Sequence, residues 1–155
     1  MRRLEESTEI ESPPEVVWQT LRDFGDVAKW APRIVRSRPT SGHAEGVGVR
    51  RVFRHLWGFQ LEEVVTAWDE GRGYSFDVLG APPPLKNVRE AWTIDTVSTG
   101  ARVSTTVEYE MGLGAIGHLI DWMLVRHLIR AEMRLGLAGL KQYVEPSRHP
   151  LIERE

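Results

Sequence analysis

Between residues 47 and 111, apolar side chains recur at every second position, and this alternation constrains the fold more than any single motif. A period of two is typical of strands that bury one face of a sheet. Turn signals divide the region into five predicted strands, at residues 47–54, 58–68, 74–79, 88–96 and 102–111. The connections are short, so we expect neighbouring strands to run antiparallel.

The segment before this region predicts two more strands with two short helices between them. Residues 4–10 alternate weakly and residues 34–38 look extended. Between them, Ser12-Pro13-Pro14-Glu15 supplies a cap, a proline in the first turn and an early acidic residue for a first helix. Gly25 and Pro32 bracket a second, short helical piece.

A long helix is predicted near the end of the chain. From about residue 118 to residue 144 the pattern is helical, and Pro146 ends it. At 1.5 Å per residue this helix would be about 40 Å long, enough to lie across a whole sheet. The predicted fold is therefore α+β, with a seven-stranded antiparallel sheet wrapped around the long C-terminal helix and two short helices between strands 1 and 2. A sheet that wraps in this way leaves a hollow, and hollows bind small molecules.

Composition argues against several classes of function. The chain has 155 residues and a formal net charge of −2, which suits one domain and gives no general attraction for nucleic acid. It contains no cysteine, which rules out disulfides, thiolate nucleophiles and zinc–thiolate sites. Its five histidines do not have the spacing of a metal-binding helix or finger. We therefore predict no metal site, no cofactor and no nucleic-acid partner.

No segment predicts export or a membrane span. The start of the chain turns acidic where a signal peptide would need an apolar core, so we expect a cytoplasmic protein. The most apolar region, residues 111–125, is interrupted by Asp121 and is shorter than the roughly 20 residues that a transmembrane helix needs. We expect one ligand-binding domain over residues 1–145 and a polar C-terminal tail over residues 146–155.

Several stretches together carry a resemblance to a known superfamily. They are SPPEVVW, FGDVAKWAPRIV, GVGVRRV, EEVVTAWDEGRGYSF, PPPLKNVREAWTI and the helix end GLAGLKQYV. The chain resembles the START-like (SRPBCC, Bet v 1-like) superfamily over roughly residues 5–144, and within it the polyketide cyclase/dehydrase branch. The resemblance implies a helix-grip fold with a deep, mainly apolar cavity for a small hydrophobic molecule. It also implies a family that includes carriers, sensors and some cyclases.

Strand alternation assigns every second side chain to the hollow, and that face is mostly apolar. With the long helix and the Trp30 segment, it yields these predicted ligand-binding residues: Trp30, Arg51, Phe53, Leu61, Glu63, Tyr74, Phe76, Trp92, Tyr109, Leu128 and Leu135. A one-residue slip or a bulge would turn any of the strand residues outward. An Arg51–Glu63 pair would more often be a structural cross-strand bridge than a catalytic unit. The Trp30 segment has two open roles, a mobile cap over the entrance or a buried anchor.

Glu132 lies on the apolar side of the predicted long helix, opposite a row of arginines. No residue one helical turn away can neutralise it. If it is buried, its partner must come from the sheet, and Arg51 is the best candidate. If it lies at the edge of the helix, its carboxylate reaches water instead. On the same side, Gly136 and Gly139 predict a close approach of a ligand or a strand to the helix backbone.

Three classes of function remain open at this point. The first is binding, as a carrier or sensor, of a small hydrophobic molecule such as a lipid, polyketide or isoprenoid. The second is a polyketide cyclase or dehydratase, with Glu132 or Glu90 as general acid/base and Arg51 polarising a carbonyl or enolate. The third is a protein-interaction role, which nothing in the charge pattern demands. We favour binding, because the pattern indicates a pocket directly and a catalytic group only by inference. The ligand and the oligomeric state are not predicted.

Overall fold

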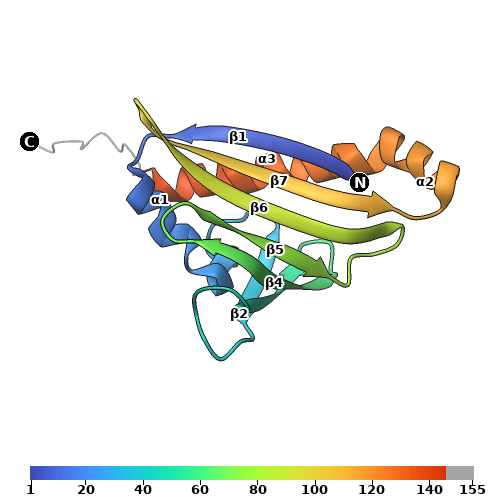
Figure 1. Cartoon of the computed structure of the whole chain (residues 1–155), viewed down its shortest axis with the longest axis horizontal. Helices are drawn as coiled ribbons and strands as arrows, with labels where there is room; N and C mark the ends of the chain where they lie inside the picture. The colour runs from blue at the N-terminus through green and yellow to red at the C-terminus, as the bar shows by residue number, and fades with distance from the viewer. Residues whose placement is uncertain (146–155) are drawn as a thin grey trace, which may run out of the picture.

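The computed structural model describes residues 1–145 and shows a seven-stranded antiparallel sheet with a long helix behind it (Figure 1). The strands are β1 (Arg2–Ile10), β2 (Ile34–Pro39), β3 (Arg50–His55), β4 (Gln60–Asp69), β5 (Gly73–Leu79), β6 (Leu85–Val97) and β7 (Gly100–Met111). Their order across the sheet is β1-β7-β6-β5-β4-β3-β2, so β2 to β7 form a meander and β1 pairs with the last strand. The predicted α+β fold is confirmed. The predicted tail, residues 146–155, lies outside the described residues.

Two short helices lie between β1 and β2, as predicted. They are α1 (Pro14–Leu21) and the 3₁₀ helix η1 (Phe24–Lys29). Pro14 begins the first helix, as expected for a residue with a fixed φ and no N–H to satisfy. The predicted cap is wrong, because Pro13 occupies the capping position and no side chain caps the helix.

The long helix begins earlier than predicted and is not uniform. After β7 the chain forms α2 (Gly114–Ile120), the π-helical turn η2 (Asp121–Val125) and α3 (Arg126–Val144) without a break. The α3 backbone lies closest to β1 and β7. Polar contacts fix it there: Arg130 donates to Glu6 on β1 at 2.9 Å, and Lys141 donates to the carbonyl of Glu9 at 2.6 Å.

Gly139 marks the place where another segment touches the helix backbone. A Cβ at this position would lie 2.2 Å from the carbonyl oxygen of Trp30 and 2.7 Å from Cδ of Pro32. At Gly136 the nearest atom would be 3.6 Å away, on the Trp92 ring, which is ordinary packing distance. The helix backbone is therefore closely approached at Gly139 but not at Gly136, and the approaching segment is the connection between η1 and β2 rather than the predicted ligand or strand.

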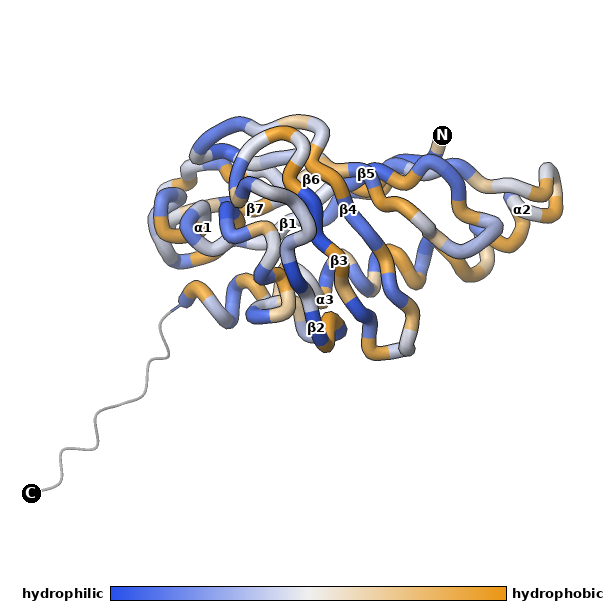
Figure 2. The backbone as a smooth tube through the Cα atoms, turned by 90° about the horizontal axis from the view of Figure 1, so that it is seen from below, coloured by the Kyte–Doolittle hydropathy of each residue, from blue (hydrophilic) through white to orange (hydrophobic). Residues whose placement is uncertain are grey.

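The Trp30 segment is a buried anchor in this structure. The side chain of Trp30 is 8% exposed, and its ring packs edge to face on Trp92 with centroids 5.3 Å apart. Around it, a large apolar cluster joins α1, η1, the sheet and the end of α3. A second, smaller cluster lies further along the groove and includes Leu4, Val107, Tyr109 and Met133. Along β3 burial alternates residue by residue, as expected for a strand with one buried face, and Figure 2 shows both hydrophilic and hydrophobic stretches along β3 and β4.

Candidate functional site

The strand register arranges the side chains of the concave face in rows. Cross-strand partners share a face, so each set of paired residues forms one row. One row comprises Arg51, Glu63, Val78 and Val88; the next comprises Val65, Phe76, Glu90 and Val107; a third comprises Tyr74, Trp92 and Thr105. The three ionisable residues predicted for this face, Arg51, Glu63 and Glu90, therefore lie on two adjacent rows.

Arg51 and Glu63 form a buried ion pair between β3 and β4. Both residues are 4% exposed, and Nε of Arg51 donates to the Glu63 carboxylate. Nη1 of Arg51 also donates to the carbonyl of Phe24 at 2.8 Å, and the guanidinium carbon lies 3.8 Å from the centre of the Phe24 ring. Burial raises the pKa of Glu63, and the positive charge of Arg51 opposes that rise. The Arg51 guanidinium is thus engaged by protein groups on two sides.

Glu90 is a half-buried carboxyl group on β6, next to this pair. It accepts hydrogen bonds from Nε1 of Trp92 at 2.7 Å and from Oγ1 of Thr105 at 3.2 Å. Burial raises its pKa to about 7, with a further contribution from the negative charge of Glu63, whereas the Trp92 hydrogen bond lowers it. Among residues 1–145, no cationic group forms a direct ion pair with it. Glu90 can therefore hold or release a proton near neutral pH.

Glu132 belongs to a separate polar cluster at the edge of the groove. Arg33, just before β2, pairs with one carboxylate oxygen, and Nε2 of His55 lies 3.3 Å from the other. Nδ1 of His55 accepts the N–H of Trp57 at 3.1 Å, so the ring proton lies on Nε2 and points at Glu132. The prediction that Arg51 pairs with Glu132 is wrong, because the Arg51 guanidinium pairs with Glu63. The Glu132 side chain is 35% exposed, which fits the edge position.

The predicted ligand-binding residues divide into two groups by exposure. The buried group is Trp30, Arg51, Phe53, Glu63, Tyr74, Phe76, Trp92 and Tyr109. The group with partial or greater exposure is Leu61, Leu128 and Leu135. Tyr109 lies apart from the other aromatic residues and donates its hydroxyl to buried Asp121. Of the predicted residues, only the second group and Glu90 keep appreciable exposed surface.

Sequence reasoning missed four residues that complete these clusters: Phe24, Arg33, His55 and Thr105. Phe24 and Arg33 lie in or next to the short helical piece, where no period reveals which side chains turn inward. The contact of Thr105 with Glu90 depends on the pairing of β6 with β7, which neither strand reveals by itself.

The concave face of β4, β5 and β6 is not sealed by the helix. Leu61, Val78 and Val88 all keep partial exposure, although they lie on the inner face of the sheet. On the helical side, Leu128 is 41% exposed and Ile129 is half-buried. Because α3 lies closest to β1 and β7, these apolar side chains from sheet and helix are not sealed into a closed core.

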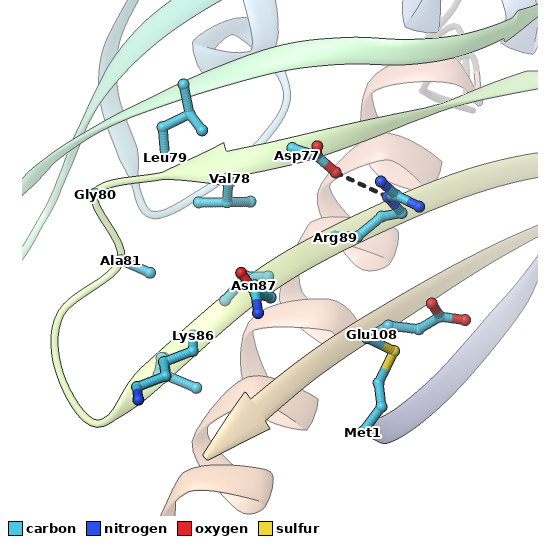
Figure 3. Close-up of a pocket in the computed structure, with 12 residues that line it drawn as sticks. Met1, Asp77, Val78, Leu79, Gly80, Ala81, Lys86, Asn87, Arg89 and Glu108 are labelled. Carbon is cyan, nitrogen blue, oxygen red and sulfur yellow. Dashed lines mark hydrogen bonds and ion pairs between the residues drawn. The ribbon is translucent and has the colours of Figure 1, made fainter. Parts of the chain in front are cut away.

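A depression of about 490 Å³ lies beside the loop between β5 and β6 (Figure 3). Charged side chains border it, including Lys86, Glu108 and the Asp77–Arg89 ion pair, in which Nε of Arg89 lies 2.8 Å from the carboxylate. None of the predicted ligand-binding residues lines this depression. Two of its lining residues, Val78 and Val88, also belong to the inner face of the sheet.

Two features are absent from residues 1–145. No group of three or more His, Asp or Glu side chains there is arranged to hold a metal ion. None of the helices in that range has the length and apolar character to cross a bilayer.

Solved structures with the same fold cover nearly the whole chain. The protein XoxI from Bacillus cereus has 25% sequence identity and a TM-score of 0.71, over 92% of this chain and 94% of its own. Ara h 8.0201 has 18% identity and a TM-score of 0.72, over 92% and 97%. The di-domain ARO/CYC protein BexL, from the BE-7585A biosynthetic pathway, has 19% identity and a TM-score of 0.77, over 93% of this chain and 46% of its own.

A comparison with curated protein sequences gave no match. The family described as "Polyketide cyclase / dehydrase and lipid transport" matches residues 1–145, which is the whole of the described chain. The predicted superfamily and its helix-grip, Bet v 1-like fold are thereby confirmed. The chain belongs to the polyketide cyclase/dehydrase and lipid transport family.

Proposed function

We propose that this chain binds a small hydrophobic molecule, as a carrier or sensor, in the hollow between α3 and strands β4 to β6. The observation that carries the proposal is the set of apolar side chains that keep partial or greater exposure on both sides of the hollow: Leu61, Val78 and Val88 from the sheet, and Leu128 and Ile129 from the helix. An apolar ligand would remove their surface from water, which is worth about 25 cal/mol per Å². The family description, which names lipid transport, agrees with this role.

Glu90 gives the hollow a polar side. With a pKa of about 7, it can donate a hydrogen bond when protonated and accept one when ionised. A ligand with one hydroxyl or carbonyl group on an otherwise apolar body would match this arrangement. A fully ionised, strongly polar molecule would leave the apolar walls without a partner.

The test compares two substitutions on neighbouring residues of β6. Val88→Trp fills the hollow, whereas Arg89→Trp adds the same ring on the outer face, where the arginine side chain is 54% exposed. Titration with a fluorescent apolar dye should show about tenfold weaker binding for Val88→Trp and less than about twofold change for Arg89→Trp. Circular dichroism would verify that both variants fold. A wild-type protein that binds no dye and carries no lipid by native mass spectrometry would contradict the proposal, as would equal effects of the two variants.

A second function, that of a cyclase or dehydratase, is favoured by one specific observation. Glu90 combines a pKa near neutrality with a position beside the hollow, and both properties suit a general acid/base. Glu132, the other predicted catalytic carboxylate, has its oxygens engaged by Arg33 and His55. Arg51 is held by Glu63 and the Phe24 carbonyl, so Glu90 is the stronger catalytic candidate.

Turnover of linear poly-β-ketone substrates would test this second function. Glu90→Gln should lower kcat by about a hundredfold or more, whereas Glu132→Gln should change it less. The pH profile of the wild-type rate should show an ionisation near 7, and Glu90→Gln should lack it. Wild-type activity in Glu90→Gln would exclude Glu90 as the acid/base.

A further inference from the structure

The segment that follows β7 exposes an unusual density of large apolar side chains. We call Leu113, Ile116, Leu119, Trp122, Met123 and Leu124 the apolar tip; each is between 52% and 68% exposed. In Figure 1, α2 projects beyond the end of the sheet, and Figure 2 shows it largely in apolar colours. Exposing this much contiguous apolar surface is unfavourable in water, and such surfaces mark sites of interaction.

The apolar tip is not a single stripe. Ile116, Leu119 and Trp122 follow at intervals of three residues, so each side chain is turned by about 60° from the one before. Met123, the next residue, points about 100° further round. A partner helix packs along one stripe of about 100°. The apolar side chains of the tip are therefore spread around the helix, which suits an apolar environment on several sides better than contact with one flat protein surface.

The cationic groups next to the tip are two arginines, Arg2 and Arg126, and Glu110 lies on the side of Arg2 and His118. Asp121 is the only acidic residue among residues 111–131. It is fully buried, and it pairs with Arg126 at 3.1 Å, with Arg2 at 3.2 Å and with the Tyr109 hydroxyl. The exposed surface of residues 111–131 therefore carries no carboxylate, while Arg126 lies within this segment.

We propose that the apolar tip inserts into the interface of a lipid bilayer that contains anionic lipids. Apolar side chains around a helix end would enter the boundary between headgroups and acyl chains, and a tryptophan is favoured at that depth. Arg2 and Arg126 would lie beside the headgroups, where each cation near an anionic membrane contributes to binding. This docking is independent of ligand binding in the hollow, since its side chains point outward.

Sedimentation of the full chain with lipid vesicles tests the proposal. Vesicles of phosphatidylcholine with about one third phosphatidylglycerol should bind the protein, and vesicles of phosphatidylcholine alone should bind it more weakly. The double variant Ile116→Ser/Trp122→Ser should partition at least about tenfold less. Tyr143→Ser is the matched control, because this aromatic residue is 52% exposed at the opposite end of the same helical run. It should bind vesicles like the wild type.

Three results would overturn the proposal. They are absence of wild-type binding to anionic vesicles, unchanged binding by the double variant, and equal losses in the double variant and Tyr143→Ser. A wild-type dimer that the double variant dissociates, without vesicle binding, would identify the tip as a self-association surface instead. Circular dichroism and dye titration on the same samples would separate a folding defect, or a failure of ligand binding, from a loss of docking.

Discussion

Two carboxylate clusters lie between the sheet and the long helix, and they differ in how far water reaches them. The Arg51–Glu63 pair, with Glu90 beside it, is enclosed by aromatic rings and has little access to water. The Glu132 cluster also contains one arginine, Arg33, but the Arg33 and Glu132 side chains are each about one third exposed, although His55 beside them is buried. Ion pairs screened by water contribute little to stability, whereas breaking a buried pair leaves a charge that water cannot solvate. The same chemical contact therefore has different consequences at the two places.

The largest expected effect is the loss of the buried cation. Arg51→Ala would leave Glu63 unpaired and the Phe24 carbonyl without its donor, and should lower the free energy of unfolding by about 3–5 kcal/mol. Arg33→Ala, its counterpart at the edge, should lower it by no more than about 1 kcal/mol. Urea denaturation of both variants measures the difference, and similar losses would remove the contrast between the clusters.

The second effect depends on pH and concerns Glu90. Its pKa rises from the ordinary value of 4.5 to about 7 on folding, so between these values the native state holds a proton that the unfolded chain releases. Stability should therefore fall as the pH rises through this window and level off above it, by a total of order 3 kcal/mol. Glu90→Gln cannot ionise and should lack this component. Unfolding free energies of both proteins at several pH values test it, and parallel curves would contradict it.

A third, smaller contrast tests how firmly α3 is fixed between the two clusters. Gly139→Ala places a methyl group against the Trp30 carbonyl and should destabilise the fold by about 1–3 kcal/mol. Gly136→Ala meets only ordinary contacts and should stabilise the helix by up to about 1 kcal/mol. Thermal unfolding should shift in opposite directions for the two variants. If both variants shifted the unfolding temperature in the same direction, the Trp30 segment would have moved to make room for the methyl group at residue 139.

The smallest effect is expected at Glu132 itself. Glu132→Gln keeps the shape of the side chain and removes only a half-exposed charge, so the loss in unfolding free energy should be about 1 kcal/mol or less. Glu63→Gln is the matched change in the buried cluster and should cost more. Denaturation curves of the two variants measure both losses in unfolding free energy. A larger loss for Glu132→Gln than for Glu63→Gln would contradict the prediction.

The fold and the inner face could be predicted because both depend on a local period. Alternation along each strand identified the face of Arg51, Glu63 and Glu90 without knowledge of their neighbours. The partners of Glu132 could not be found in this way, because Arg33 and His55 are 99 and 77 residues away along the chain. Their approach depends on how the sheet curls, which no single segment encodes.

Local irregularities account for other differences. The register of β4 against β5 shifts between Val65 and Ala67, and this bulge turns Trp68 inward, where it stacks on Tyr74 with ring centroids 5.6 Å apart. Strict alternation from Val65 would have placed Trp68 on the outer face. The π turn was equally invisible, since its residues fit an ordinary helical pattern.

That π turn also makes the chain sensitive to its length at one place. The N–H of Arg126 bonds to the carbonyl of Asp121, five residues back, so η2 contains in effect one residue more than an α-helix would. Deletion of a single codon there would restore regular helix and rotate everything before it by about 100°. Asp121 would leave its arginine partners, and α2 would present a different side. A single deletion during evolution could therefore change which face of α2 is exposed, without changing any side chain of α2.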